Sequence, residues 1–201
     1  MTPTQRIVMA SLLAAAACAP MIQPELGDAR PGRYVGDPTH VSAVFRLARP
    51  GATPLTGRFD AIDAALDFDP LRPDQSQVRA VIDPASLSTG SAAQSDELAR
   101  AGLFADDAPI VFESRRVRLT GPQTAQVSGP LTWNGAVHDV TFAVRFNGSL
   151  THIVPPLTGR RAVGFSGSTQ VRPSRWGAFA TSDRVADQIA VAIEAEFLAA
   201  R

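Results

Sequence analysis

The sequence predicts an all-β protein: an antiparallel up-and-down barrel of about eight strands with one short helix between about residues 91 and 104. Short segments of alternating apolar and polar residues recur along the chain, and short Pro- or Gly-containing turns join neighbouring segments. The alternation gives way to a helix-favouring pattern between Pro84 and Asp107. A sheet of this many strands tends to curl, and closure removes its exposed edges. A β-sandwich is the alternative architecture.

The clearest element is a hairpin formed by residues 127–133 and 137–146, joined through Asn134-Gly135. Asn-Gly between alternating segments is a strong hairpin signal, because both residues tolerate the positive φ of a primed turn. One face of the second strand is almost wholly apolar, as expected for a sheet with one side turned to a core or lumen. That face carries His138, Val140, Phe142, Val144 and Phe146.

The other elements follow from the same patterns. A helix is expected from Ser91 to Gly102, where glycine ends it. The glycines in the predicted strand 161–171 indicate tight barrel bends or close backbone approach. The remaining strands are expected at 40–48, 56–61, 64–69, 78–83, 110–119 and 188–198.

Composition excludes several classes of function. The 201 residues have a formal net charge of zero, which argues against nucleic acid as a partner, since phosphate binding needs an excess of cations on one face. Phosphate-binding loops of the Walker or Rossmann type are absent from the sequence. The chain has one cysteine, so an internal disulfide cannot form.

The N-terminal region is typical of an exported lipoprotein. Arg6 precedes the apolar run Ile7 to Ala17, which has the size of a signal-peptide core and is too short to span a bilayer. Small residues precede Cys18, a pattern that resembles a bacterial lipobox, although the usual leucine is replaced by Ala15. We therefore expect a signal peptide at 1–17, a lipidated tether at 18–31 and a barrel domain at 32–201. Ordinary cleavage nearby, without acylation, is the alternative.

Catalytic and metal-binding patterns are weak. The histidines His40, His138 and His152 lie far apart and share no metal-ligand spacing, so no metal site is predicted. Asp37 and His40 could pair, with Ser42 on the same strand face as His40, but a hydrogen-bonded structural corner explains this spacing better. No catalytic residue is assigned.

Large apolar side chains at alternating positions are the distinctive feature. They are consistent either with a filled core or with a cavity for a long hydrophobic ligand. The residues predicted to line such a tunnel are Phe45, Phe59, Phe68, Phe112, Trp133, Phe142, Phe146, Phe165 and Phe197.

An ordered series of short motifs resembles the YceI-like family of exported bacterial lipid-binding proteins. Each motif alone is weak, but the set extends from Gly32 to Phe197. It comprises the segments at 34–40, 57–59, 67–70, 81–90, 96–98, 103–104, 109–114, 129–135 and 163–165.

The resemblance implies a lipocalin-like barrel with an elongated apolar tunnel that binds polyisoprenoid chains, quinones or fatty amides, and no established enzymatic activity. Two positions depart from the family pattern. Val41 replaces the serine after His40, and Pro173 to Gly177 (PSRWG) replaces Arg-Ser-x-Phe-Gly. Arg172 and Arg175 flank the place of the family arginine, so any headgroup contact there is shifted or lost.

The resulting hypothesis is a periplasmic barrel, anchored through acylated Cys18, that sequesters or carries a long-chain lipid. Asp37, His40, Arg172 and Arg175 are predicted to form the rim that meets the headgroup. No cofactor is expected other than a bound isoprenoid or quinone, and the oligomeric state is open, with a homodimer as one option. The alternatives are a lipid-ester hydrolase using Asp37 and His40, a solid structural barrel, and a haem protein using His138.

Overall fold

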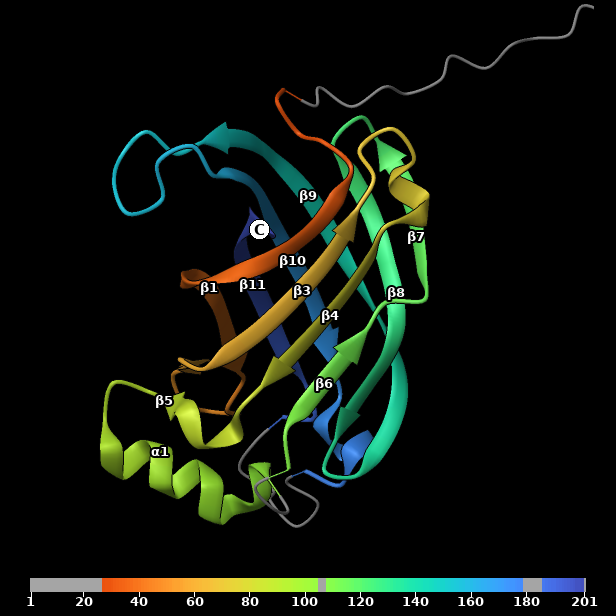
Figure 1. The fold of residues 1–201 in the computed structure, drawn as a ribbon. Helices are drawn as coiled ribbons and strands as arrows, with labels where there is room; N and C mark the ends of the chain where they lie inside the picture. Colours follow the sequence, from red (N-terminus) through yellow and green to blue (C-terminus); the bar gives the residue numbers. More distant parts are fainter. Residues whose placement is uncertain (1–26, 105–107, 179–185, 201) are drawn as a thin grey trace, which may run out of the picture.

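The computed structural model describes residues 27–104, 108–178 and 186–200. In these residues one antiparallel sheet of eleven strands curls into a closed barrel (Figure 1). Eight of the strands follow one another around the ring in the order β11-β10-β9-β8-β6-β4-β3-β1, and pairing of β1 with β11 closes it. The predicted fold class is confirmed. The ring strands are β1 (Gly32–Leu47), β3 (Ile62–Phe68), β4 (Gln77–Ile82), β6 (Ile110–Glu113), β8 (Thr124–Trp133), β9 (Ala136–Thr151), β10 (Arg161–Val171) and β11 (Ile189–Ala199).

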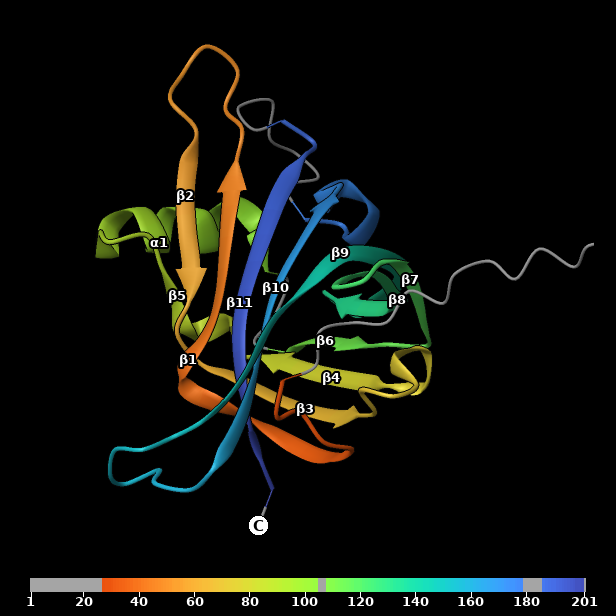
Figure 2. The same ribbon diagram turned by 90° about the horizontal axis from the view of Figure 1, so that it is seen from above.

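Three shorter strands lie off the ring. β2 (Leu55–Phe59) pairs with the second half of β1, and β5 (Leu87–Ser88) pairs with β2. β7 (Arg116–Gly121) pairs with β8 and lies against the short 3₁₀ turn η1 (Pro73–Gln75). Figure 2 shows β2 and β5 on one side of the barrel and β7 on the other.

The predicted hairpin is the β8–β9 pair. Its turn residues Asn134 and Gly135 have φ values of +48° and +72°, as a primed turn requires. The register of the pair runs from Trp133 opposite Ala136 to Thr124 opposite Arg145. Because side chains alternate along a strand, the predicted apolar face of β9 is turned inward over most of its length.

The one α-helix of the described residues lies at one end of the barrel (Figure 1). α1 (Ala92–Leu98) continues into a wider turn, η3 (Ala99–Leu103), in which Gly102 has a φ of +84° and ends the helix as predicted. Leu98 and Leu103 are buried in the core. The indole Nε1 of Trp133 donates a hydrogen bond to the Leu103 carbonyl at 3.1 Å, which ties the turn to the end of β8.

A second tryptophan supports the same end. The 3₁₀ turn η4 (Pro173–Trp176) follows β10, and Trp176 is 2% exposed. Its Nε1 donates to the Leu131 carbonyl at 3.0 Å, and its ring lies 5.7 Å from that of Trp133.

Among the described residues no helix is both long and apolar enough to cross a membrane. The remaining 3₁₀ turn, η2, spans Pro84–Ser86.

Candidate functional site: an apolar cavity inside the barrel

The barrel encloses a cavity of about 290 Å³, close to the lower bound of roughly 300 Å³ for ligand pockets. Every strand of the ring contributes to its wall. Among the described residues that line it, none carries a formal charge. The cavity can therefore accommodate an apolar chain but has no partner for a charge at its centre.

The nine aromatic residues predicted to line a tunnel all line this cavity. They belong to two packed groups. Towards the α1 end, Phe112 lies 5.0 Å from Phe142 between ring centroids, and Phe45 lies 5.6 Å from Phe59. Towards the other end, Phe165 contacts Phe68, Phe146 and Phe197 at centroid distances of 5.5, 5.3 and 6.1 Å. The aromatic side chains thus pack within each group and still leave a cavity along the barrel.

The polar residues of the cavity wall gather where the β3–β4 and β7–β8 turns lie side by side (Figure 1). They are Ser76, Gln77, Gln123 and Thr124, with Thr169 further along β10. The sequence did not single out any of these side chains. The first four share only a position beside a turn, and the sequence of one turn does not indicate which other turn it will meet.

The four predicted rim residues do not form one rim, and none of them lines the cavity. Arg172 directly follows Val171, which pairs with Ile189 at the start of β11, whereas Asp37 lies near Glu196 at the other end of β11. Seven residues of extended strand separate these points by roughly 23 Å. Arg172 and Arg175 instead border a hollow on the outer surface.

Asp37 and His40 do pair, in a bulge of β1. His40 Nδ1 lies 3.0 Å from Asp37 Oδ2, and the Thr39 backbone N–H and hydroxyl both donate to Asp37 Oδ1. Burial raises the pKa of Asp37, but the hydrogen bonds from His40 and Thr39 outweigh it and lower the pKa to about 2. The hydroxyl beside His40 Nδ1 is that of Thr39, at 2.9 Å. Ser42, which the sequence placed on the same strand face as His40, has no described bond to it.

His138 lies on the same face of β9 as Phe142, as predicted, but outside the cavity wall. Its Nε2 is 2.8 Å from the carbonyl oxygen of Arg175, and Arg175 Nη2 is 3.1 Å from its Nδ1. The ring also packs edge-on against Trp176 at 5.1 Å. Both ring nitrogens thus have protein partners, and neither is directed to the cavity as an axial haem ligand would have to be. The structure therefore gives no support to the haem alternative. Cys18 lies outside the described residues.

A closed antiparallel ring of eight strands around an uncharged apolar cavity defines the lipocalin-like class of up-and-down β-barrels. Within that class the comparisons place the chain in one family. The model of the YceI-like domain matches residues 34–197, and the chain belongs to that family.

Relatives agree with this assignment. A UPF0312 protein of Ectopseudomonas mendocina is 31% identical over 135 residues, which cover 66% of this chain and 69% of the relative. A UPF0312 protein of Azotobacter vinelandii is 30% identical over 155 residues, covering 75% and 79%.

Solved structures share the fold. BcnA of Burkholderia cenocepacia superposes with a TM-score of 0.66 at 20% identity, covering 80% of this chain and 98% of that one. A domain from Saccharophagus degradans described as polyisoprenoid binding gives a TM-score of 0.57 at 12% identity, covering 85% and 100%.

Proposed function

We propose that the barrel binds one long-chain apolar lipid, of the isoprenoid quinone, polyprenyl or fatty amide type, and sequesters or carries it. The observation that carries the proposal is the uncharged cavity walled by aromatic and aliphatic side chains from every strand of the ring. The polyisoprenoid-binding description of the Saccharophagus degradans domain supports the same ligand class. The proposal includes no catalytic step.

Burial of the apolar tail of the lipid supplies the binding free energy. Each CH₂ transferred from water contributes about 0.8 kcal/mol, so one five-carbon repeat contributes about 4 kcal/mol before ordering costs. We place the polar headgroup at the β3–β4 and β7–β8 turns, beside Gln77 and Gln123, because the polar wall residues gather there. This location replaces the predicted rim of Asp37, His40, Arg172 and Arg175.

The proposal predicts that the purified full-length chain carries a lipid. Native mass spectrometry should show an adduct, and organic extraction should release a prenyl or long-chain compound. The delipidated protein should take up one ubiquinone-type quinone per chain, with quenching of fluorescence from Trp133, which lines the cavity. A purified protein that never carries a lipid and shows no saturable quenching with quinones, prenyl alcohols or fatty amides would refute the proposal and favour a non-binding structural barrel.

We further propose that the protein is exported to the periplasm and anchored through acylated Cys18. The support is the sequence pattern of Arg6, the apolar run and the small residues before the cysteine. Cys18→Ser is expected to move the protein from the membrane fraction to the soluble periplasmic fraction and to remove the mass of the acyl groups. Unchanged fractionation and mass in the variant would contradict the anchor and leave lipid binding by the barrel untouched.

A further inference from the structure

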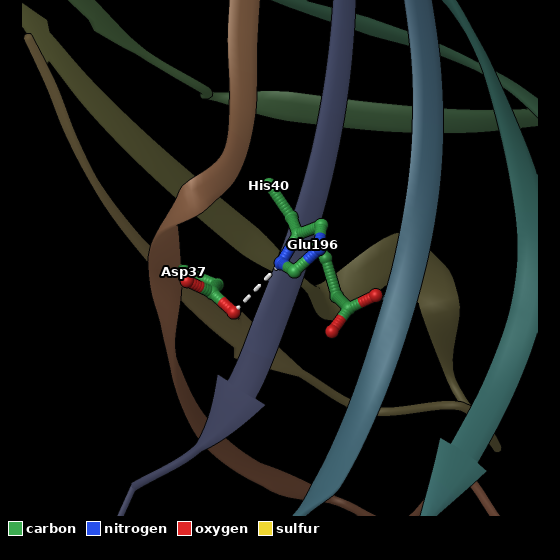
Figure 3. A group of neighbouring side chains, drawn as sticks. All are labelled: Asp37, His40 and Glu196. Atoms are coloured by element: carbon green, nitrogen blue, oxygen red, sulfur yellow. Dashed lines mark hydrogen bonds and ion pairs between the residues drawn. The ribbon is translucent and has the colours of Figure 1, made fainter. Parts of the chain in front are cut away.

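A group of ionisable side chains lies on the outer face of the barrel, away from the cavity. Between the pairs Gly36–Phe197 and Val41–Ala195, β1 contains the four residues 37–40, whereas β11 contains only Glu196. The excess residues form a bulge, which directs side chains that a regular strand would separate towards one point. Figure 3 shows the imidazole of His40 directed towards Asp37, with the Glu196 carboxylate nearby.

The outward direction of Glu196 follows from strand alternation. Ala195 and Phe197, its neighbours on β11, line the cavity, so Glu196 faces the other way. One potential ligand atom each from Asp37, His40 and Glu196 lies within 4.8 Å of the other two. A tetrahedral ion with bonds of about 2.1 Å spaces its ligands by about 3.4 Å, so small side-chain rotations would complete the geometry.

We propose that Asp37, His40 and Glu196 bind one divalent transition-metal ion of the zinc type, with water in the remaining position. One imidazole and two carboxylates form a ligand set that zinc accepts. The side chain of His40 is 58% exposed and gives the ion access from solvent, whereas the side chain of Asp37 is only 6% exposed. Two carboxylates that lie within reach of one point give it a negative charge that attracts a divalent cation.

A fourth residue holds one of the ligands in place. His152 Nε2 lies 2.9 Å from Glu196 Oε1, and both side chains are about four-fifths buried, with exposures of 19% and 21%. His152 is itself fixed in the β9–β10 connection, because its backbone N–H donates to the Arg160 carbonyl at 2.9 Å. A hydrogen bond from an imidazole to one carboxylate oxygen orients the other towards a metal, an arrangement that raises affinity at known sites.

The test is zinc binding by the untagged full-length chain after treatment with a chelator. Isothermal titration calorimetry is expected to show one saturable zinc site per chain. Glu196→Gln and His40→Gln should each abolish it, and His152→Ala should weaken it roughly 10- to 100-fold. Repeating the titration in Cys18→Ser excludes the thiol as a ligand.

Glu194→Gln is the matched control. Glu194 lies two residues away on the same outer face of β11 and accepts a hydrogen bond from Ser166 Oγ, so the variant removes an equal charge without touching the group. It should bind zinc as the wild type does. Absence of saturable binding in the wild type, equal loss in Glu194→Gln, or retained binding in Glu196→Gln with intact circular dichroism would each overturn the proposal. Quinone uptake reports on the barrel interior and is expected to be unchanged in all of these variants.

Discussion

Replacement of Gly167 with leucine is expected to reduce lipid uptake by about tenfold or more, which corresponds to at least about 1.4 kcal/mol of binding free energy. Gly167 lies in β10 opposite Val144 of β9 and Ile193 of β11, and all three residues line the cavity. A Cβ at Gly167 would lie 3.7 Å from the Ile193 Cβ and 3.8 Å from the nearest Val144 methyl, which are ordinary contacts. Alanine therefore fits, and the longer leucine side chain extends into the space that a ligand tail would occupy.

The matched control is Ser168→Leu. Ser168 is the next residue of β10, is exposed and faces outward, so the variant adds the same leucine side chain outside the barrel. Quinone titration followed by tryptophan quenching should give wild-type affinity for Ser168→Leu, a small loss for Gly167→Ala and a large loss for Gly167→Leu. Thermal unfolding should show that Gly167→Leu remains folded. Wild-type uptake by a folded Gly167→Leu variant would mean that the tail does not pass through the middle of this cavity.

The sequence predicted the parts of this fold that depend on local pattern. Alternation predicted which side chains of β9 face inward, because successive Cβ atoms point to opposite faces wherever a strand forms. Asn134 and Gly135 predicted the hairpin, because their tolerance of positive φ is a property of those residues alone. The nine aromatic wall residues could be predicted for the same reason, since a closed barrel has one inside.

The groups that depend on long-range register could not be predicted. Glu196 meets His40 only because β11 returns to pair with β1 and because β1 bulges at that pair. No local pattern in either strand specifies that pairing. The same reason explains the error over the rim: Arg172 and Asp37 each adjoin a strand end or bulge, but the direction of their strands places them at opposite ends of β11. The polar wall residues Gln77 and Gln123 were missed because they lie at two turns, β3–β4 and β7–β8, that only the closed barrel brings together.

The strand glycines differ in what a side chain at their position would contact. At Gly167 the missing side chain leaves room in the cavity wall, and at Gly164 a Cβ would meet only the Asn147 Cβ, at 3.7 Å. Gly129 of β8 is different, because a Cβ there would lie 1.9 Å from the Glu113 carbonyl oxygen, 2.9 Å from the carbonyl carbon and 3.0 Å from the Ser114 Cα. All three neighbours are backbone atoms, which no rotamer change can move.

The backbone that faces Gly129 is held on both sides. β6 ends at Glu113, and the Ser114 N–H donates to the Val78 carbonyl at 2.9 Å while the Ser114 hydroxyl accepts from the Val78 N–H at 2.8 Å. The next residue, Arg115, donates its N–H to the Ser128 carbonyl at 2.8 Å. A side chain at Gly129 would therefore have to break hydrogen bonds that join β4, the end of β6 and β8.

Gly129→Ala is accordingly expected to lower the free energy of unfolding by about 3 kcal/mol or more, at the upper end of the range for overpacked sites. Urea denaturation followed by circular dichroism measures the change, and Gly164→Ala, which adds the same methyl group to a strand glycine with open space, should cost less than about 1 kcal/mol. A folded Gly129→Ala protein with near wild-type stability would contradict this expectation and would mean that β8 and the end of β6 separate at little cost in free energy. The pairing of β6 with β8, which joins only Val111 to Thr132 and Phe112 to Leu131, would then be the weak point of the cavity wall.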